Sequence, residues 1–258
     1  MIQAIDTHCH VHYGPLEKLE PNKMAKTMQE GNCYSAYPDV LLKNSEAAGI
    51  SRIFASPFDG LFSIARTEEA NEKMAELAQE TKELYQWVII DPRNPKTYRQ
   101  AERMLKHEKC VGIKLHPHPL CHNYDLADSG DEIFAFAQKH EAVVLIHPEK
   151  NPEYLVPFAN RYPGATLIAA HLSSEHHIEA VRQAEHRNLY IDTATSSSLK
   201  NRIVEYAVSQ IGSDRILFGT DTYSAAMQRG RIEFAPLPET DKENILLRNA
   251  QRLFHLAD

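Results

Sequence analysis

The chain has 258 residues, of which 43% are hydrophobic and 24% charged, as in an ordinary soluble globular protein. Its net charge is −7 and it has no basic run, so we expect neither nucleic acid nor an anionic membrane as a partner. The absence of a secretory signal and of an apolar run of membrane-spanning length predicts a cytoplasmic protein. Four cysteines without a CxxC spacing do not indicate a disulfide framework.

Short apolar runs rich in β-branched or aromatic residues recur along the chain, each followed by proline, glycine or polar residues. Such short continuous runs are typical of parallel strands that are buried on both faces. We predict eight strands, at residues 4–10, 51–56, 85–90, 111–116, 142–147, 166–171, 189–193 and 216–219.

Segments with helical periodicity alternate with these strands, at residues 38–49, 67–84, 95–108, 131–140, 152–162, 174–187, 199–211 and 240–256. Eight strands alternating with eight helices predict an α/β fold of the (β/α)8 TIM-barrel type. A doubly wound open sheet is the alternative, but no strand is followed by a glycine-rich phosphate loop. No linker composition divides the chain, so we expect one domain over residues 1–258. The segment 11–37 is longer than an ordinary loop, and we expect it to form a lid or insertion after the first strand.

The first predicted strand carries the sequence Asp-Thr-His-Cys-His-Val-His. Residues two apart on a strand share a face, so His8 and His10 should project together with Asp6 behind them. Ile5 and Cys9 should then face the other way. Two imidazoles held on one strand can reach the same divalent metal ion.

Further chemically reactive side chains stand at the ends of later predicted strands. The active site of a barrel of this type lies at the carboxyl ends of its strands. Lys114 and His116 share one face of the fourth strand, His147 and His171 end the fifth and sixth, and Asp221 follows the eighth. Their arrival at one rim predicts a metal site. Zinc suits imidazole and carboxylate ligands best, although manganese, iron and nickel are also compatible.

Motifs spread over the whole chain resemble the amidohydrolase superfamily, in the branch of amidohydrolase-related proteins that includes aminocarboxymuconate-semialdehyde decarboxylase. They are DTHCHVH, GIKLHP, LIHP, AAHL, LFGTD and ENILLRNAQRLF. The resemblance implies that His8 and His10 bind the more buried metal ion. It also implies that His147 and His171 come from strands five and six, and that Asp221 is the carboxylate of strand eight.

The resemblance leaves the number of metal ions open. Dihydroorotase-like relatives carry a carboxylated lysine on strand four in a similar context, and Lys114 would then bridge two ions. If Lys114 is not modified, His8, His10, His147 and Asp221 would hold one ion. We favour two ions here, because Lys114 lies on the face that alternation requires.

The chain departs from the superfamily pattern in two places. The usual His-Thr-Gly after strand five is His147-Pro148-Glu149, and the proline common after the strand-eight aspartate is absent from Asp221-Thr222-Tyr223-Ser224. Both departures lie where a substrate would sit, so they leave the substrate class open.

The leading hypothesis is a metal-dependent hydrolase that activates water to cleave a C–N, C–O or lactone bond in a small carbonyl substrate. Asp221 would act as general base, and His171 would polarise the carbonyl. A metal-dependent non-oxidative decarboxylase of a small unsaturated or aromatic acid is the alternative, and a non-catalytic metal-binding protein is a third. The partner is a small molecule, and the resemblance allows a homodimer. The candidate substrate-binding residues are His12, Arg93, His116, His118 and Tyr223.

Overall fold

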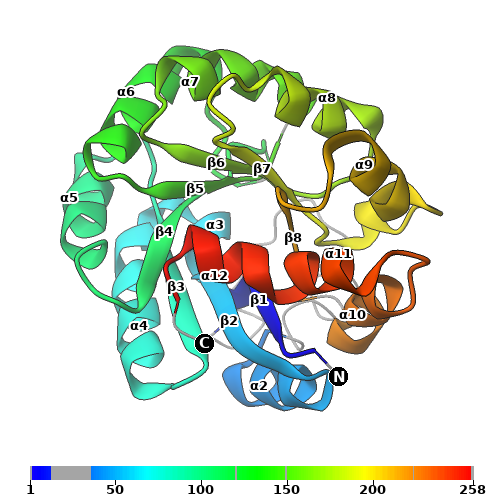
Figure 1. The fold of residues 1–258 in the computed structure, drawn as a ribbon. Helices are drawn as coiled ribbons and strands as arrows, with labels where there is room; N and C mark the ends of the chain where they lie inside the picture. Colours follow the sequence, from blue (N-terminus) through cyan, green and yellow to red (C-terminus); the bar gives the residue numbers. More distant parts are fainter. Residues whose placement is uncertain (1, 13–35, 120, 149, 223, 257–258) are drawn as a thin grey trace.

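A computed structural model describes residues 2–12, 36–119, 121–148, 150–222 and 224–256 of the chain. Its strands are all parallel and are hydrogen-bonded to one another in the order in which they occur in the sequence. Figure 1 shows them forming a ring with the helices on the outside. The strands are β1 (Ala4–Val11), β2 (Ile50–Pro57), β3 (Leu84–Ile89), β4 (Cys110–Leu115), β5 (Val143–Ile146), β6 (Thr166–Ala169), β7 (Leu189–Asp192) and β8 (Ile216–Leu217).

Backbone hydrogen bonds join the last strand region to the first and so close the ring. The amide of Thr7 donates to the carbonyl of Phe218 at 2.9 Å, and the amide of Asp221 donates to the carbonyl of His8 at 2.7 Å. Closure brings the start and the end of the chain together at β1. The predicted (β/α)8 barrel is confirmed, and each predicted strand overlaps an observed one.

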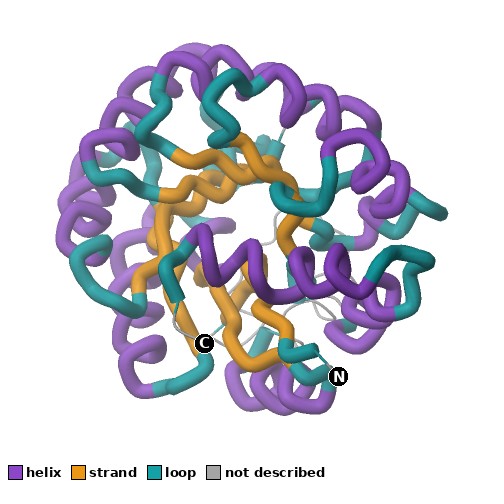
Figure 2. The backbone as a smooth tube through the Cα atoms, viewed as in Figure 1, coloured by secondary structure: helices purple, strands orange, loops and turns teal. Residues whose placement is uncertain are grey.

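Most of the helices cover the outer face of the ring, as the tube in Figure 2 shows, and the last of them runs across one end of the barrel (Figure 1). They are α2 (Pro38–Ala47), α3 (Phe58–Phe62), α4 (Thr67–Glu80), α5 (Pro95–Met104), α6 (Leu126–Lys139), α7 (Val156–Arg161), α8 (Glu175–Gln183), α9 (Ile203–Ile211), α10 (Ala225–Glu233), α11 (Glu239–Glu243) and α12 (Asn249–Leu253). None of the described helices is both long and apolar enough to cross a membrane.

Several helix boundaries differ from the sequence-based prediction. Helix α6 begins five residues before the predicted start, because the side chain of Asp125 accepts a hydrogen bond from the amide of Ala127 and caps the helix. The predicted helix at 240–256 is interrupted by a π-helical segment between α11 and α12. Helices α3 and α10 were not predicted; both lie in what were expected to be loops. The proposed insertion at 11–37 lies largely outside the described residues.

The apolar core has two layers. Strand residues such as Val144 pack outward against helix residues such as Phe134. A second cluster fills the inside of the barrel and contains Phe54 and Trp87. The ring of Phe254, which follows α12, packs edge-on against both, with centroid separations of 4.9 and 5.6 Å. The amino end of the barrel is therefore plugged with apolar side chains, and any polar site must lie toward the carboxyl ends of the strands.

Strand β1 does not alternate regularly along its length. Ile5 belongs to the cluster inside the barrel, whereas Cys9 packs in the outer layer. The prediction that Ile5 and Cys9 share a face is therefore wrong. The pairing of β1 with β2 shifts register between Asp6 and Cys9, and such an irregularity inserts a residue and reverses the alternation. Because of this shift, β1 presents Ile5 to the apolar cluster at the amino end of the barrel. His8 and His10 then point into the interior nearer the carboxyl ends of the strands.

Candidate metal and active site

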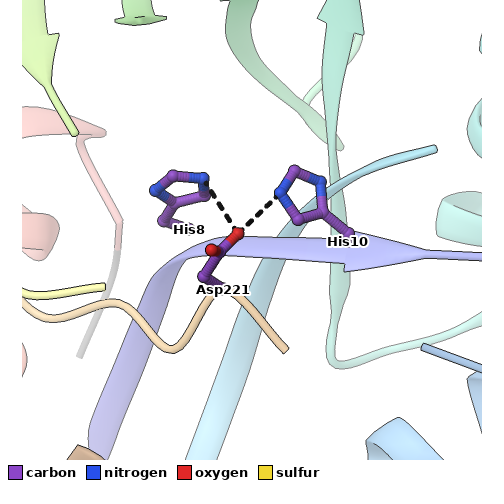
Figure 3. Close-up of side chains that lie close together, drawn as sticks. All are labelled: His8, His10 and Asp221. Carbon is purple, nitrogen blue, oxygen red and sulfur yellow. Dashed lines mark ion pairs between the residues drawn. The ribbon is translucent and has the colours of Figure 1, made fainter. Parts of the chain in front are cut away.

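Three ligand-type atoms from two ends of the chain converge inside the barrel. The carboxylate oxygen Oδ1 of Asp221 lies 2.8 Å from Nε2 of His10 and 3.6 Å from Nε2 of His8. Figure 3 shows the two imidazole rings on β1 directed at this carboxylate. Both histidines are buried, at 0% and 3% exposure. The barrel closure at β8 and β1 is what places Asp221 beside histidines more than two hundred positions away in the sequence.

Each histidine of β1 is oriented through its other ring nitrogen. Nδ1 of His8 lies 2.8 Å from Asp192, and Nδ1 of His10 lies 2.9 Å from the hydroxyl of Ser56. Hydrogen bonds of this kind set which ring nitrogen of a histidine is free to bind a metal ion. The partners come from the carboxyl end of the neighbouring strand β2 and from β7, which lies beyond β8, so strands on both sides of β1 hold its rings.

Asp221 is held by an unusual backbone. Its φ is +57°, in the left-handed region, and Thr222 follows at +61°. Thr220 anchors this turn, since its hydroxyl and amide donate to the buried carboxylate of Asp6 at 2.5 and 3.0 Å. Burial raises the pKa of Asp6 to about 7. Burial would also raise the pKa of Asp221, but the hydrogen bond from His10 and the charges of the neighbouring histidines hold it well below the usual value.

Close packing against His8 also depends on a glycine. A Cβ atom added at Gly219 would lie 2.8 Å from the Cβ atom of His8 and 3.1 Å from that of Ala194. A larger residue at this position would therefore push the β8 turn away from β1. Glycine is required here for close approach rather than for a turn.

Lys114 lies on the inner face of β4, as the alternation predicted. It is fully buried, and its Nζ atom lies 2.9 Å from Nε2 of His8. Burial lowers the pKa of Lys114 to about 8, against the attraction of Asp221 and Asp192.

His147 and His171 form a second pair beside the first. Nε2 of His171 lies 3.0 Å from Nδ1 of His147, and its ring stacks on that of His8 with centroids 4.9 Å apart. His171 has a φ of +71°, which turns its side chain into the barrel after β6. Burial lowers the pKa of His171 to about 4. His147 is bonded to His171 and does not join the cluster of His8, His10 and Asp221 in this structure.

Of the predicted substrate-binding residues, His12 is fully buried, and its Nδ1 lies 3.0 Å from the carboxylate of Asp59. Its Nε2 has no hydrogen-bond partner among the described residues. The ring of His116 stacks on that of His147 at 4.2 Å, and His118 lies edge-on to His147 at 5.7 Å. These two therefore line the His147 side of the rim.

Arg93 differs from the other candidates. Its guanidinium forms an ion pair with Asp91, with Nη2 2.7 Å from the carboxylate and Nε at 3.0 Å, and about half of the side chain is exposed. Its donors are largely engaged within the protein. The remaining candidate, Tyr223, lies outside the described residues.

The donor set fits a divalent metal ion. His8, His10 and Asp221 offer ligand atoms within 4.8 Å of one another, and two imidazole nitrogens with one carboxylate oxygen match the ligands that zinc and manganese accept. His8, His171 and Asp192 form a second group of the same kind. In addition, the buried Nδ1 atom of His171 has no hydrogen-bond partner within the described part of the chain.

The sequence-based prediction missed Asp192, Ser56 and Asp59. Ser56 ends its predicted strand and Asp192 lies one residue before the end of another, so a search of strand ends like the one that selected His147 and His171 could have included them. They were passed over because neither stood in a recognised motif. Asp59 carried no signal, since the helix α3 that holds it was not predicted.

Comparison with known proteins decides the family. A family model described as Amidohydrolase matches residues 5–256. The chain belongs to the amidohydrolase family. This confirms the resemblance that the strand-end motifs indicated. No curated protein matches the chain.

Several solved structures share the fold over nearly their whole length. A 2,6-dihydroxybenzoate decarboxylase in complex with 2,6-dihydroxybenzoate is 16% identical, with a TM-score of 0.76, and the alignment covers 99% of this chain and 100% of that one. A dihydroxybenzoic acid decarboxylase from a Polaromonas species, with manganese and 2-nitroresorcinol bound, is 18% identical, with a TM-score of 0.75 and coverage of 99% and 97%. A manganese-containing 5-carboxyvanillate decarboxylase from Novosphingobium aromaticivorans is 14% identical, with a TM-score of 0.72 and coverage of 99% and 96%.

The expectation of a hydrolase is contradicted by these comparisons. The similar structures are mainly decarboxylases, and they favour the alternative that the sequence had left second. The error has a physical origin. The same metal ligands can activate a water molecule or anchor a carboxylate, so the ligand motifs do not distinguish the two reactions.

Proposed function

We propose that the protein is a metal-dependent, non-oxidative decarboxylase of a small aromatic or unsaturated carboxylic acid. The observation that carries the proposal is the convergence of Nε2 of His8, Nε2 of His10 and Oδ1 of Asp221 at the polar end of the barrel. The fold is the one that the manganese-containing decarboxylases use. The family match favours an enzyme over a metal-binding protein without catalysis.

His8, His10 and Asp221 would hold the metal ion, with His171 stacked beside them. When bound, a divalent ion supplies a fixed positive charge that anchors the substrate's oxygen atoms and stabilises negative charge developing on them. His8, His10 and His171 are buried and Asp221 is only 16% exposed, which limits the access of water to the site and strengthens the electrostatic interactions within it.

Decarboxylation replaces a carbon–carboxylate bond with a carbon–hydrogen bond, so the protein must deliver one proton to the carbon that loses carbon dioxide. We assign this proton to the carboxyl group of Asp221, because Nε2 of His10, 2.8 Å from its Oδ1 atom, carries no hydrogen while it binds the metal ion. His171, whose ring stacks on that of His8 at 4.9 Å, would orient the departing carboxylate. His12, with its Nε2 buried and unpartnered among the described residues, is the best-placed residue to bind a hydroxyl group of the substrate.

We propose one metal ion in each chain. The atoms of His8, His10 and Asp221 surround a single position, and the second ligand-type group, which contains His171 and Asp192, shares His8 with the first. Manganese and zinc are both compatible with this set. Two ions bridged by a carboxylated Lys114 remain the alternative prediction. Elemental analysis with intact mass distinguishes them, because the alternative requires two ions and the added mass of carbon dioxide.

The test is carbon dioxide release by metal-loaded protein from 2,6-dihydroxybenzoate, 5-carboxyvanillate and related ring-hydroxylated benzoates. We expect release that is lost on chelation, restored by manganese or zinc, and inhibited by 2-nitroresorcinol. His10→Gln should abolish it, whereas the control His186→Gln, at an exposed position before β7, should not. Failure to decarboxylate any acid of this panel, with stoichiometric metal bound, would overturn the proposal.

A further inference from the structure

Asp192 is a buried carboxylate at the carboxyl end of β7, a strand to which the sequence assigned no functional residue. It is 0% exposed. Its Oδ2 atom lies 2.8 Å from Nδ1 of His8. Its Oδ1 atom accepts hydrogen bonds from two backbone amides, those of His171 and Ala194, each at 2.9 Å. A single carboxylate therefore contacts a ring on β1 and the backbone that follows β6.

The two oxygens of Asp192 have distinct tasks. Oδ1 faces two backbone amides, which can only donate, so this position must be occupied by an acceptor. Oδ2 faces the ring of His8. A carboxylate there accepts the hydrogen on Nδ1 and leaves the lone pair of Nε2 directed toward Asp221 and Lys114.

The contact made by the other ring nitrogen of His8, Nε2, indicates the same tautomer. Nζ of Lys114 lies 2.9 Å from Nε2 of His8 and is a donor, so it requires a lone pair on that nitrogen. The ring is thus held between an acceptor at Nδ1 and a donor at Nε2. Both contacts are buried, where an unsatisfied polar atom costs most.

We propose that Asp192 is a positioning residue that fixes His8 in the tautomer with hydrogen on Nδ1 and holds the backbone of His171 in its left-handed conformation, with φ of +71°. It acts through these two residues and touches neither metal nor substrate. The proposal rests on the proposed function only in taking Nε2 of His8 as the metal-binding atom.

Asp192 could instead be read as a metal ligand, since it forms a ligand-type group with His8 and His171. Its contacts favour the positioning role. Both oxygens already accept hydrogen bonds, and a metal ion between Asp192 and His8 would have to displace the hydrogen on Nδ1.

The substitution Asp192→Asn distinguishes the positioning role of Asp192 from a role as metal ligand. The amide oxygen must take the place of Oδ1, because two backbone amides point at it. The amide nitrogen then faces Nδ1 of His8 as a donor and requires a lone pair there. His8 is driven into the opposite tautomer, with hydrogen on Nε2, and loses its metal-binding lone pair. A carboxylate-to-amide change has this consequence wherever a carboxylate orients a functional histidine.

The experiment records ¹⁵N–¹H correlation spectra of the histidine rings in metal-free protein, with the His8 signals identified by their absence in His8→Gln. We expect hydrogen on Nδ1 in the unsubstituted protein and on Nε2 in Asp192→Asn. Titration with Zn²⁺ against a chromophoric chelator should show about 10- to 100-fold weaker binding in Asp192→Asn. Asp214→Asn, which changes an exposed carboxylate paired with Arg187, should leave both measurements unchanged.

Hydrogen on Nε2 of His8 in the unsubstituted metal-free protein would overturn the proposal without any variant. Loss of metal from Asp192→Asn with an unchanged His8 tautomer would also overturn it, because it would show that Asp192 is a ligand. Neither readout requires turnover. A protein that shows the predicted tautomers but releases no carbon dioxide would therefore refute the proposed function and leave the role of Asp192 intact.

Discussion

Two corners of the barrel rim contain the same types of residue but differ in how their polar atoms are satisfied. At the corner of β1 and β8, His8, His10 and Asp221 direct their atoms at one point. At the corner that follows β3 and β4, Asp91 is enclosed by other side chains. It is bonded to Nη2 of Arg93 at 2.7 Å and to Nδ1 of His122 at 2.9 Å.

The groups of the second corner are directed at one another. Nε2 of His122 donates to the carbonyl of Gly60 at 2.7 Å, and Arg93 also donates to the carbonyls of His122 and Asn123. Its groups tie α3 to the loops after β3 and β4 and have little capacity left for a ligand. Histidine and aspartate at a strand end therefore indicate a site only when their atoms are left directed at a common point. When they satisfy one another, the cluster stabilises the fold.

We expect the largest difference between the two corners to come from Asp221→Asn. This change removes the carboxylate from the convergent corner, so we expect the decarboxylation kcat of metal-loaded protein to fall by about 10²- to 10⁴-fold. The free energy of unfolding should change less than in a variant of the other corner. Steady-state kinetics measures kcat, and urea unfolding of the same preparation measures the free energy of unfolding. Retention of more than a tenth of the activity would remove Asp221 from its catalytic role.

The matching change in the satisfied corner is Asp91→Asn. The carboxylate is 0% exposed, and its loss leaves Nδ1 of His122, a side chain at 1% exposure, without the carboxylate that it faces. Removing one partner of such a buried pair costs about 3 to 5 kcal/mol, which urea unfolding should detect. Asp214→Asn, in an exposed ion pair, should cost less than ~1 kcal/mol. If Asp91→Asn and Asp214→Asn lowered the free energy of unfolding equally, the corner around Asp91 would not have the structural role inferred from its contacts.

A smaller effect concerns the pH dependence of the same corner. Burial would raise the pKa of Asp91, but the hydrogen bonds from His122 and Arg93 hold it well below the usual value of 3.8. A pKa lower in the folded than in the unfolded state stabilises the protein above the unfolded value, and this contribution is lost as the pH falls below it. The difference in unfolding free energy between the unsubstituted protein and Asp91→Asn should therefore narrow as the pH falls from about 5 to about 2. A difference that stays constant over this range would contradict the assignment.

The barrel itself was predictable because its strands are local apolar runs and their order needs no long-range information. The exceptions had local causes that sequence patterns do not reveal. The register shift in β1 reversed the alternation between Asp6 and Cys9, so the position of Ile5 was wrong. Helix α3 escaped prediction because five residues, Phe58–Phe62, are too few for helical periodicity to be visible.

Part of the candidate site followed from the strand-end rule, and part did not. The rule selected His8, His10 and Asp221, which the structure brings together, and Lys114, which contacts His8. It could not indicate that Arg93 is paired with Asp91, because that pairing depends on the conformation of one loop. The predicted reaction was wrong for a different reason, since ligands shared by hydrolases and decarboxylases do not identify the bond that breaks.

The sequence by itself determined the type of fold, the family and the strands that carry the candidate ligands, because each depends on residue type and on spacing along the chain. Only the tertiary structure decided which polar groups satisfy one another and which remain directed at a shared position. That distinction depends on contacts such as those of Asp192 with His8 and His171. Burial makes each such contact energetically significant, and no local pattern in the chain specifies it.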